Sequence, residues 1–558
     1  QHKKGITLNQ QLLAVILQGS RADLLPLGPS QYRNQWTEAL GTVLHETAHM
    51  YDFLNLQPKT TQDYVEHCRS IQNHQDNHLP PACEVLRTLK TTVSTDPRYL
   101  EAAGWPLSSQ GENLRSKENV LSFRSVDAIE LKNPVEHFAS NFEHYLLDPE
   151  YSCRKPTLAD FFDRHFQLKK KTACSPLYYV NPSSRFADQS VQQLPLNRIY
   201  QVQLLHAGPG SELMSNWGHT MFRVVVCSPE RQTVGPDCLK DENHHLVLSF
   251  RAFINTPAIN SWKGLTGQYP SRLFIVPFDE VKKTYLDIEG RDLFSFPFIL
   301  SSENLSRFLK RAIEIHWSYD SRYYFISNNC AVESLNFIRS LNINFDLLSE
   351  KIITPNELVR VLERNKIIER PQGTPQELLR MGYLHQNRIP FQVHALQLLT
   401  GKKESLKNLN EFYLKPVSER KSLFTDQVNL EQKAAALYLE EIALERFTKQ
   451  INENLMNQAF EMNLSEAQSI IDSYMKSVSF FNTFSAPHEF FQSSRYGIPS
   501  TEEIYQQINV ITNSWNERKN NDLSRRKLLD SLIGEKNLNE IKNSEDLIQL
   551  LRQALFEE

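Results

Sequence analysis

The middle of the chain alternates apolar and polar residues over four short stretches, at 199–205, 220–226, 245–250 and 272–276. A period of two residues turns successive side chains to opposite faces of a strand, so these stretches predict a β-sheet. Apolar residues recur with helical spacing over residues 1–170 and 303–345, and again from about 355 to the end. We therefore expect an α+β protein in which the sheet lies between helical regions.

Local composition predicts where one domain ends and the next begins. The stretch Asn181–Ser190 is rich in Pro, Ser, Asn and Asp, which is typical of a boundary. We expect a helical domain over residues 1–180, a domain containing the sheet over 190–350, and a helical domain over 355–558. The last of these carries no motif that we can connect with a chemical activity.

Composition narrows the class of protein. The 558 residues are 40% apolar and 23% charged, with a formal net charge of -4. The apolar share is typical of a packed protein, and the balanced charge gives no sign of a nucleic-acid partner. Apolar stretches such as Leu12–Leu17 are far shorter than the roughly 18 residues of a membrane-spanning helix. The sequence begins at Gln1 without Met, which fits the removal of a targeting peptide or of a cleaved tag.

The seven cysteines indicate the compartment. Cys330 has no partner nearby in the sequence, and the other six form three local couples: Cys68 with Cys83, Cys153 with Cys174, and Cys227 with Cys238. Short loops of this kind are typical of disulfides in exported proteins, so we expect a periplasmic or secreted location. The alternative is a cytosolic protein with seven reduced cysteines. An odd cysteine in an oxidising compartment is a candidate reactive thiol.

The first candidate for chemistry is a zinc site. Residues 45–49 read His-Glu-Thr-Ala-His, within a segment that can form one helix over 38–54. On that helix His45 and His49 are one turn apart and can bind one Zn²⁺, while Glu46 can take a proton from the water on the metal. Zinc lowers the pKa of this water to roughly 7, which supplies a nucleophile at neutral pH.

A catalytic zinc needs a third protein ligand. Residues 133–148 form a predicted amphipathic helix on which Glu136 and Glu143 share a face. Here the sequence resembles the gluzincin metallopeptidases, in which a Glu-x-Phe-Ala-type helix downstream of His-Glu-x-x-His supplies the third ligand. The resemblance implies that Glu136 is this ligand and that Glu143 is a partner behind the ligands or the alternative ligand. His144 and Tyr145 are candidates to stabilise an oxyanion.

Two alternatives to a catalytic zinc site stay open. A zinc ion could stabilise the fold without any reaction. The helix could also be an ordinary amphipathic helix whose histidines bind nothing. The presence of Glu46 favours catalysis, because a structural zinc site does not require a base there.

The second candidate is a pair of His219 and Cys330. Residues 217–226 read Trp-Gly-His-Thr-Met-Phe-Arg-Val-Val-Val, so His219 begins a predicted strand, and Cys330 follows Asn-Asn at a predicted helix N-terminus. We expect the helix dipole and a nearby imidazole to lower the pKa of the Cys330 thiol and favour the thiolate. A histidine within hydrogen-bonding reach is what a thiol nucleophile needs. The alternative is a buried cysteine at a helix start and a histidine in the core.

Residues 198–340 resemble papain-like folds of the circularly permuted NlpC type. They resemble more closely the periplasmic domain of the Lnb lipoprotein N-acyltransferase family, in their Gly-His-x-x-x-Arg and Asn-Asn-Cys segments. The resemblance implies a domain with an antiparallel sheet, Cys330 as nucleophile and His219 as general base. It also implies acyl transfer or hydrolysis through a thioester. Lnb enzymes carry membrane spans, which this sequence does not predict.

The resemblance does not decide every residue of the thiol site. The residue that orients the histidine is expected on the strand after it, and Ser249, His245 and Arg251 are the candidates. Asn329 is a candidate for the oxyanion site through its side chain or its backbone.

Together these features predict an exported envelope enzyme that hydrolyses or transfers acyl groups at amide or ester bonds. Its expected cofactor is Zn²⁺. Its expected partners are an envelope lipoprotein, a peptide or a lipid, with peripheral membrane association and no nucleic acid. Two other readings stay open: only one of the two sites is catalytic, or the chain holds an acyl chain or peptide without turnover.

Overall fold

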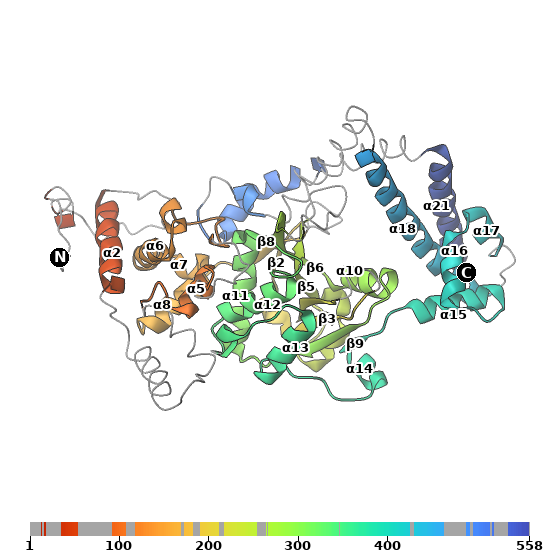
Figure 1. The fold of residues 1–558 in the computed structure, drawn as a ribbon, viewed down its shortest axis with the longest axis horizontal. Coiled ribbons are helices and arrows are strands. Elements are labelled where there is room, and N and C mark those ends of the chain that lie inside the picture. Colours follow the sequence, from red (N-terminus) through yellow and green to blue (C-terminus); the bar gives the residue numbers. More distant parts are fainter. Residues whose placement is uncertain are drawn as a thin grey trace.

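A helical region, a seven-stranded antiparallel sheet and a second helical region follow one another in the computed structural model, which confirms the predicted α+β class (Figure 1). In Figure 1 the N-terminal helices (red and orange) lie at the opposite end of the molecule from α15, α16, α17, α18 and α21 (cyan and blue). The structure describes a few isolated positions and residues 35–53, 92–107, 118–168, 172–181, 190–210, 217–253, 266–344, 346–423, 429–461, 487–491, 495–513 and 534–556.

The N-terminal region consists of short helices around an aromatic core. Its elements are α2 (Gln35–Phe53), α5 (Pro97–Ala103), η3 (Ala128–Leu131), α6 (Pro134–Leu147), α7 (Tyr151–Arg154) and α8 (Pro156–His165). Phe138, Tyr145 and Phe162 belong to the buried core of this region. The Asn133 side chain accepts hydrogen bonds from the amides of Val135 and Glu136, so it caps the start of α6. The helices predicted over 38–54 and 133–148 are thus α2 and α6.

The central sheet has the strand order β8-β6-β5-β4-β3-β7-β9, and all neighbouring strands are antiparallel. The strands are β3 (Ile199–Ala207), β4 (His219–Val226), β5 (Leu246–Ala252), β6 (Tyr269–Pro277), β7 (Leu293–Pro297), β8 (Ser321–Tyr323) and β9 (Leu384–His385). The four stretches with alternating residues correspond to β3 to β6. A separate two-stranded ribbon pairs β1 (Tyr178–Val180) with β2 (Val191–Gln193).

Alternation along the strands gives the sheet two apolar faces. Leu204 and Phe222 belong to the largest core, which includes residues of α11 (Ser302–Ser318) and α12 (Cys330–Ser340). Leu205 and Met221 belong to a second core with residues of α10 (Phe278–Lys282) and the π-helix η8 (Lys283–Ile288). Neighbouring residues of one strand therefore contact different layers of the protein.

The helical spacing predicted over 303–345 is interrupted in the structure. The helices α11 and α12 are separated by strand β8, which pairs with β6 at the edge of the sheet. Beyond residue 350, the predicted end of this domain, α13 (Pro355–Arg364) places Leu358 and Leu362 in the main core. Helix α14 (Pro375–Met381) then leads to β9, which pairs with β7. The sheet domain therefore continues to His385.

A helical bundle follows. It contains α15 (Ile389–Thr400), α16 (Leu406–Leu414), α17 (Val417–Ser422), α18 (Leu430–Glu461) and α21 (Glu535–Phe556). Leu396, Leu409, Leu439 and Leu551 are buried in its common core.

A segment between α18 and α21 leaves this bundle and packs against the rest of the molecule. It includes η10 (Pro487–Phe491) and a helix over 501–513. Phe491 and Ile504 belong to the main core beneath the sheet. Glu503 forms an ion pair with Arg154 of α7, with 2.7 Å between Oε2 and Nη1. Residues 355–558 are thus not one separate helical domain, because this segment joins the two domains that precede the bundle.

The described cysteines form disulfides between Cys153 and Cys174 and between Cys227 and Cys238, while Cys330 is free and buried. The predicted couple of Cys68 and Cys83 lies outside the described residues, as does most of the predicted boundary at 181–190. Within the described ranges no helix has the length and apolar character needed to cross a membrane.

Candidate metal centre and thiol site

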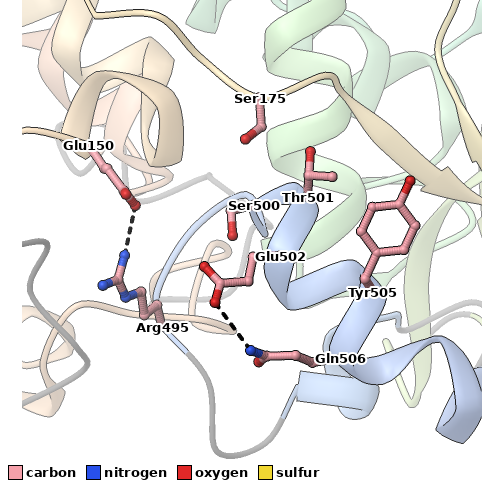
Figure 2. A pocket seen from close by; sticks show the side chains of 8 residues that line it. All are labelled: Glu150, Ser175, Arg495, Ser500, Thr501, Glu502, Tyr505 and Gln506. Atoms are coloured by element: carbon pink, nitrogen blue, oxygen red, sulfur yellow. Dashed lines mark hydrogen bonds and ion pairs between the residues drawn. The ribbon is translucent and has the colours of Figure 1, made fainter.

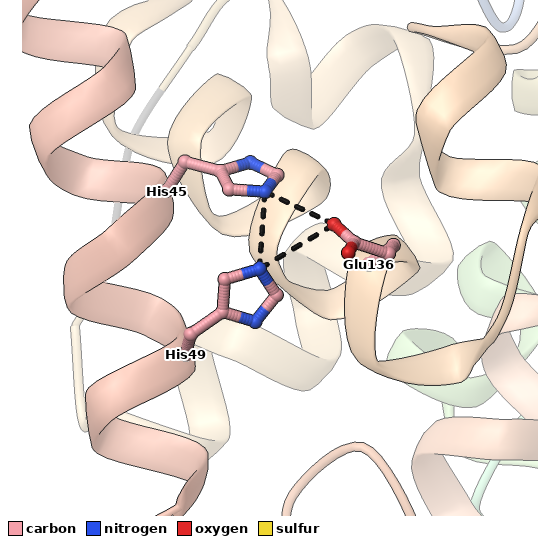
Figure 3. A group of neighbouring side chains, drawn as sticks. All are labelled: His45, His49 and Glu136. Carbon is pink, nitrogen blue, oxygen red and sulfur yellow. Dashed lines mark hydrogen bonds and ion pairs between the residues drawn. The ribbon is translucent and has the colours of Figure 1, made fainter. Parts of the chain in front are cut away.

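Two histidines from α2 and one glutamate from α6 converge at the side of the N-terminal region (Figure 3). The His45 Nε2 atom lies 3.1 Å from Glu136 Oε2 and 3.2 Å from His49 Nε2, and His49 Nε2 lies 3.4 Å from the same carboxylate oxygen. A tetrahedral ion with bonds of about 2.0–2.1 Å needs ligand atoms roughly 3.4 Å apart. Two imidazoles and a carboxylate at these distances fit Zn²⁺ in both chemistry and spacing.

Glu143 lies behind this triad. One helical face carries both glutamates, and Glu143 Oε2 is 3.5 Å from His45 Nδ1. A carboxylate beside Nδ1 favours a proton on that nitrogen and leaves Nε2 free to bind a metal. Burial raises the pKa of Glu143 to about 7. The sequence predicts Glu136 or Glu143 as the third ligand. Glu136 contacts Nε2 of both histidines, whereas Glu143 contacts only Nδ1 of His45.

The other predicted residues of this region have different surroundings. Glu46 is exposed on α2, one residue after His45. Tyr145 is fully buried and donates a hydrogen bond to Asp163, with 2.6 Å between the oxygens. His144 is buried, and its Nδ1 lies 2.9 Å from the Ser140 carbonyl oxygen. Neither His144 nor Tyr145 is therefore placed to stabilise an oxyanion, because burial in the core separates both from an external substrate.

A buried polar cluster fixes α6 beneath the triad. The Lys155 Nζ atom donates to both carboxylate oxygens of Glu130 at 3.0 Å and to Asn141 Oδ1 at 3.1 Å. Burial opposes the charge of Glu130, but Lys155 and His137 outweigh it and lower the pKa of this carboxyl to about 2. The cluster holds α6 to the turn before it and thereby positions Glu136.

Cys330 is the first residue of α12, at the end of the sheet where β4 begins. Its amide donates to the Tyr323 hydroxyl at 3.3 Å. Burial raises the pKa of the Cys330 thiol, although the neighbouring polar groups of Thr220, Tyr323 and Ala331 act in the opposite direction. The expectation of a lowered thiol pKa is therefore wrong, because the desolvation of a buried sulfur outweighs the helix terminus.

His219 lies at the same end of the sheet but belongs to its other face. Its Nε2 is 3.0 Å from Ser249 Oγ, and its ring stacks on Tyr285 of η8 with 6.1 Å between centroids. Among the described residues no hydrogen bond joins the imidazole to the Cys330 thiol. Burial lowers the pKa of His219 to about 3, aided by Arg251 and Arg291, so the imidazole is neutral at neutral pH.

The three candidates for the residue that orients His219 have different contacts. Ser249 contacts the imidazole directly, and Arg251 donates to the same hydroxyl at 3.0 Å. His245 lies instead beside Arg223, with 2.9 Å between Nδ1 and Nη2, and its Nε2 is 2.8 Å from the Cys238 carbonyl oxygen. Ser249 is thus the orienting residue that the geometry favours.

The side chain of Asn329 caps the start of α12. Its Oδ1 accepts the amides of Ala331 and Val332 at the start of α12, and its Nδ2 donates to the Ile353 carbonyl at 2.7 Å. These bonds occupy the side chain, so the expected oxyanion role of the Asn329 amide is not supported.

Three residues beside the thiol were not predicted from the sequence: Thr220, Tyr323 and Tyr285. The alternation in β4 contains a signal for Thr220, because it predicts that Thr220 and His219 face opposite sides of the sheet. Tyr323 and Tyr285 come from a three-residue strand and a π-helix, for which the sequence shows no periodic signal.

An open polar groove of about 720 Å³ lies away from both sites (Figure 2). It is lined by Glu150, Ser175, Arg495, Ser500, Thr501, Glu502, Tyr505 and Gln506. Arg495 pairs with Glu150 across it, with 2.8 Å between Nη1 and Oε2. None of the residues predicted from the sequence lines this groove.

Comparisons with known protein families match two successive parts of the chain. Residues 1–174 match a family described as Domain of unknown function (DUF7844), and residues 185–365 match the Lnb N-terminal periplasmic domain. No curated protein and no solved structure matches the chain. The chain thus contains a domain of unknown function followed by an Lnb N-terminal periplasmic domain, and neither a gluzincin nor a papain-like domain was identified. The Lnb domain and the disulfides point to a periplasmic location.

Proposed function

We propose that the N-terminal domain is a zinc-dependent hydrolase of amide or ester bonds in the cell envelope. The observation that carries this proposal is the convergence of His45 Nε2, His49 Nε2 and Glu136 Oε2, whose mutual distances are 3.1, 3.2 and 3.4 Å. A bound zinc would lower the pKa of water and polarise a carbonyl group. The protein supplies the ligands, the carboxylate of Glu143 that orients His45, and the base.

Glu46 is the base in this proposal. It is adjacent to His45 on α2 and three residues before His49, so its carboxylate lies on a neighbouring face of the helix. Its exposure leaves it open to a substrate that approaches from solvent. There the carboxylate accepts a proton from the attacking water and returns it to the leaving group.

Replacing Glu46→Gln tests the hydrolase. We expect the variant to bind zinc as tightly as the parent protein and to lose turnover by a factor of about 10² or more. Peptide and ester libraries would reveal turnover, and metal analysis would report zinc. The control is Glu38→Gln, which changes another exposed carboxylate of the same helix. Equal turnover in the Glu46→Gln and Glu38→Gln variants would contradict a catalytic role.

A second activity is favoured by one observation in the Lnb domain. Cys330 is free, it begins α12, and the polar groups of Thr220 and Tyr323 lie close enough to lower the pKa of its thiol. We propose that Cys330 accepts an acyl group. Its sulfur forms a bond to the acyl carbon, and the bond from this carbon to the leaving oxygen or nitrogen breaks. Because His219 does not contact the sulfur in this structure, it takes the thiol proton once a bound substrate brings the imidazole within reach, and it gives the proton to the leaving group. Water or an amine then takes the acyl group from the thioester.

The covalent intermediate tests this second activity directly. Incubation with an activated acyl ester should add the mass of one acyl group to the parent chain and nothing to Cys330→Ser. Ser249→Ala should acylate more slowly, because His219 loses the hydroxyl that orients it. Acylation of the Cys330→Ser variant to the same extent would exclude the thiol. If both this assay and the Glu46→Gln assay detect no chemistry, a binding protein is the better description.

A further inference from the structure

Arg251 lies beside the imidazole of His219, near the end of strand β5. Its Nε atom donates to Ser249 Oγ at 3.0 Å, and the same hydroxyl oxygen lies 3.0 Å from His219 Nε2. Ser249 and Arg251 are two residues apart on one strand, so their side chains share a face of the sheet. The guanidinium group of Arg251 is therefore one hydroxyl away from the proposed base of the thiol site.

No carboxylate pairs with Arg251 within the part of the chain that the structure describes, whereas the neighbouring arginines are paired. Arg291 pairs with Glu289, with 2.7 Å between Nη1 and Oε2. Arg272, which is opposite Arg251 in the pairing of β5 with β6, pairs with Asp320 at 2.9 Å. Removing a charge from water without an opposite charge is unfavourable. An anion that binds at Arg251 would supply this opposite charge.

The guanidinium group of Arg251 is half-buried and held in position. Phe274 is opposite Ser249 in the strand pairing, and the centroid of its ring is 5.9 Å from Arg251 Cζ. Ser249 occupies the Nε atom, while no hydrogen bond to another described residue occupies the two Nη atoms. Parallel N–H groups of an arginine match two oxygens of a carboxylate or a phosphate. Arg251 is thus built to bind an anion from outside.

The charge of Arg251 reaches the groups around the thiol. Burial lowers the pKa of His219 to about 3, and Arg251 and Arg291 lower it as well. Burial raises the pKa of Tyr285 to about 12, with Arg251 acting against this rise and Cys330 adding to it. The Tyr285 hydroxyl is therefore within electrostatic reach of both Arg251 and Cys330. An anion bound between these groups would offset the cations and make the imidazole of His219 a stronger base.

We propose that Arg251 binds an anionic group on the leaving side of the acyl donor that reacts with Cys330. This role rests on the proposed acylation, in which His219 gives a proton to the leaving group, because the Ser249 hydroxyl places Arg251 on the side of the imidazole. The anionic group is a carboxylate or a phosphate, which share the chemistry that an arginine recognises. Its binding holds the ester close to the sulfur and favours the reaction through proximity.

Charged thiol reagents test the anion site without any acyl transfer. The 2-sulfonatoethyl methanethiosulfonate reagent is anionic and methyl methanethiosulfonate is neutral, and both form a mixed disulfide with Cys330 that intact mass and peptide mapping detect. The ratio of the two rate constants, anionic to neutral, cancels differences in the pKa of the thiol. In the full chain this ratio should fall by about tenfold in Arg251→Gln and stay close to that of the parent in Arg251→Lys.

The matched control is Arg322→Gln, which removes the same charge from an exposed residue of β8. Arg322 precedes Tyr323, whose hydroxyl accepts the amide of Cys330, so the control changes a charge in the same neighbourhood. The control should keep the ratio of the parent. The proposal is overturned if Arg251→Gln has the ratio of the parent, or if Arg322→Gln lowers the ratio equally.

Competition in the parent protein identifies the anionic group and needs no variant. Inorganic phosphate and acetate are compared at equal ionic strength as competitors of the anionic reagent. Slowing by phosphate alone assigns a phosphate, slowing by acetate alone assigns a carboxylate, and slowing by both supports a site that accepts either. The absence of slowing by both anions would contradict the site. Failure of activated esters to acylate Cys330 would leave these results intact, so the anion site and the acylation fail separately.

Discussion

At the scale of single residues, the roles of Glu136 and Glu143 depend on distances that the sequence does not contain. Both glutamates lie on one face of a predicted helix, so periodicity alone leaves the third ligand open. The structure separates them, because Glu136 Oε2 lies within 3.4 Å of both Nε2 atoms while Glu143 contacts Nδ1 of His45. A ligand and a residue that orients a ligand have different effects on metal affinity.

We expect Glu136→Gln to weaken zinc binding more than Glu143→Gln. The first variant removes a ligand, whereas the second removes an orienting carboxylate, which typically costs 10–100-fold in affinity. Competition titrations with a zinc chelator would measure both dissociation constants. Glu150→Gln is the control, since this residue pairs with Arg154 and Arg495 away from the triad. Stronger weakening in Glu143→Gln would reverse the assignment.

The thiol gives a second prediction at this scale. Because burial raises the pKa of Cys330, its alkylation should be slower than that of a free model thiol at neutral pH and should still accelerate above pH 9. Tyr323→Phe removes a hydroxyl that lowers the pKa of the Cys330 thiol, so the apparent pKa should rise further. Alkylation rates over a pH series, followed by intact mass, provide the values. Rapid labelling with a midpoint below that of the free thiol would show that the helix terminus dominates.

At the scale of elements, the sequence predicted what local periodicity can encode. The helices α2 and α6 and the strands β3 to β6 have clear periods, and each was expected close to where it lies. The strands β8 and β9 have three and two residues, which is too short for a period to be visible. The return of residues 487–513 to the first two domains was not predictable either. It depends on contacts such as that of Arg154 with Glu503, which are 349 positions apart.

Residues 495–503 are attached to the N-terminal domain through their backbone as well as through Glu503. The amides of Gly497 and Ile498 donate to the carbonyls of Arg124 and Arg154 at 2.8 and 2.9 Å. At Gly497 φ is +64°, and a Cβ there would lie 2.2 Å from the Arg154 carbonyl oxygen. Glycine is therefore required at this position for both its conformation and its lack of a side chain.

Glu503→Gln should destabilise this attachment. Burial opposes the carboxylate charge, but Arg154 and Arg124 outweigh it and lower the pKa of Glu503 from 4.5 to about 2. A lowered pKa in the folded state stabilises the protein above pH 4.5, and this contribution disappears as the pH falls from about 4.5 to about 2. It amounts to at most roughly 4 kcal/mol, since the pKa falls by about 2.5 units and one unit corresponds to about 1.4 kcal/mol.

Thermal unfolding as a function of pH would measure this effect. The difference in unfolding temperature between the parent and Glu503→Gln should be largest near neutral pH and should vanish toward pH 2. Glu502→Gln is the matched control, since Glu502 faces the groove beside it and contacts Gln506 at 3.5 Å (Figure 2). A constant difference over the whole pH range would mean that the charge of Glu503 does not contribute.

At the scale of the whole molecule, the C-terminal bundle is connected to the thiol site through η8. The carboxylate of Asp287 accepts the hydroxyl of Tyr438 at 3.0 Å and pairs with Arg388 at 3.2 Å, both from the bundle. Two residues earlier on η8, Tyr285 stacks on His219. π-Helical turns are often found at functional sites. The bundle, for which the sequence predicted no chemistry, thus holds the element that contacts the imidazole.

This connection predicts a remote effect on Cys330. Tyr438→Phe combined with Arg388→Gln removes both partners of the Asp287 carboxylate without changing a residue of the site. We expect acylation of Cys330 to slow several-fold, because η8 and therefore Tyr285 and His219 lose their support, while zinc binding at the N-terminal domain stays unchanged. Lys407→Gln is the control, since its contact with Glu411 is exposed and 3.9 Å long. If the double variant acylates as fast as this control, the bundle does not position the histidine. If zinc affinity falls together with acylation, the effect is a general loss of folding, because the zinc triad and η8 lie in different domains.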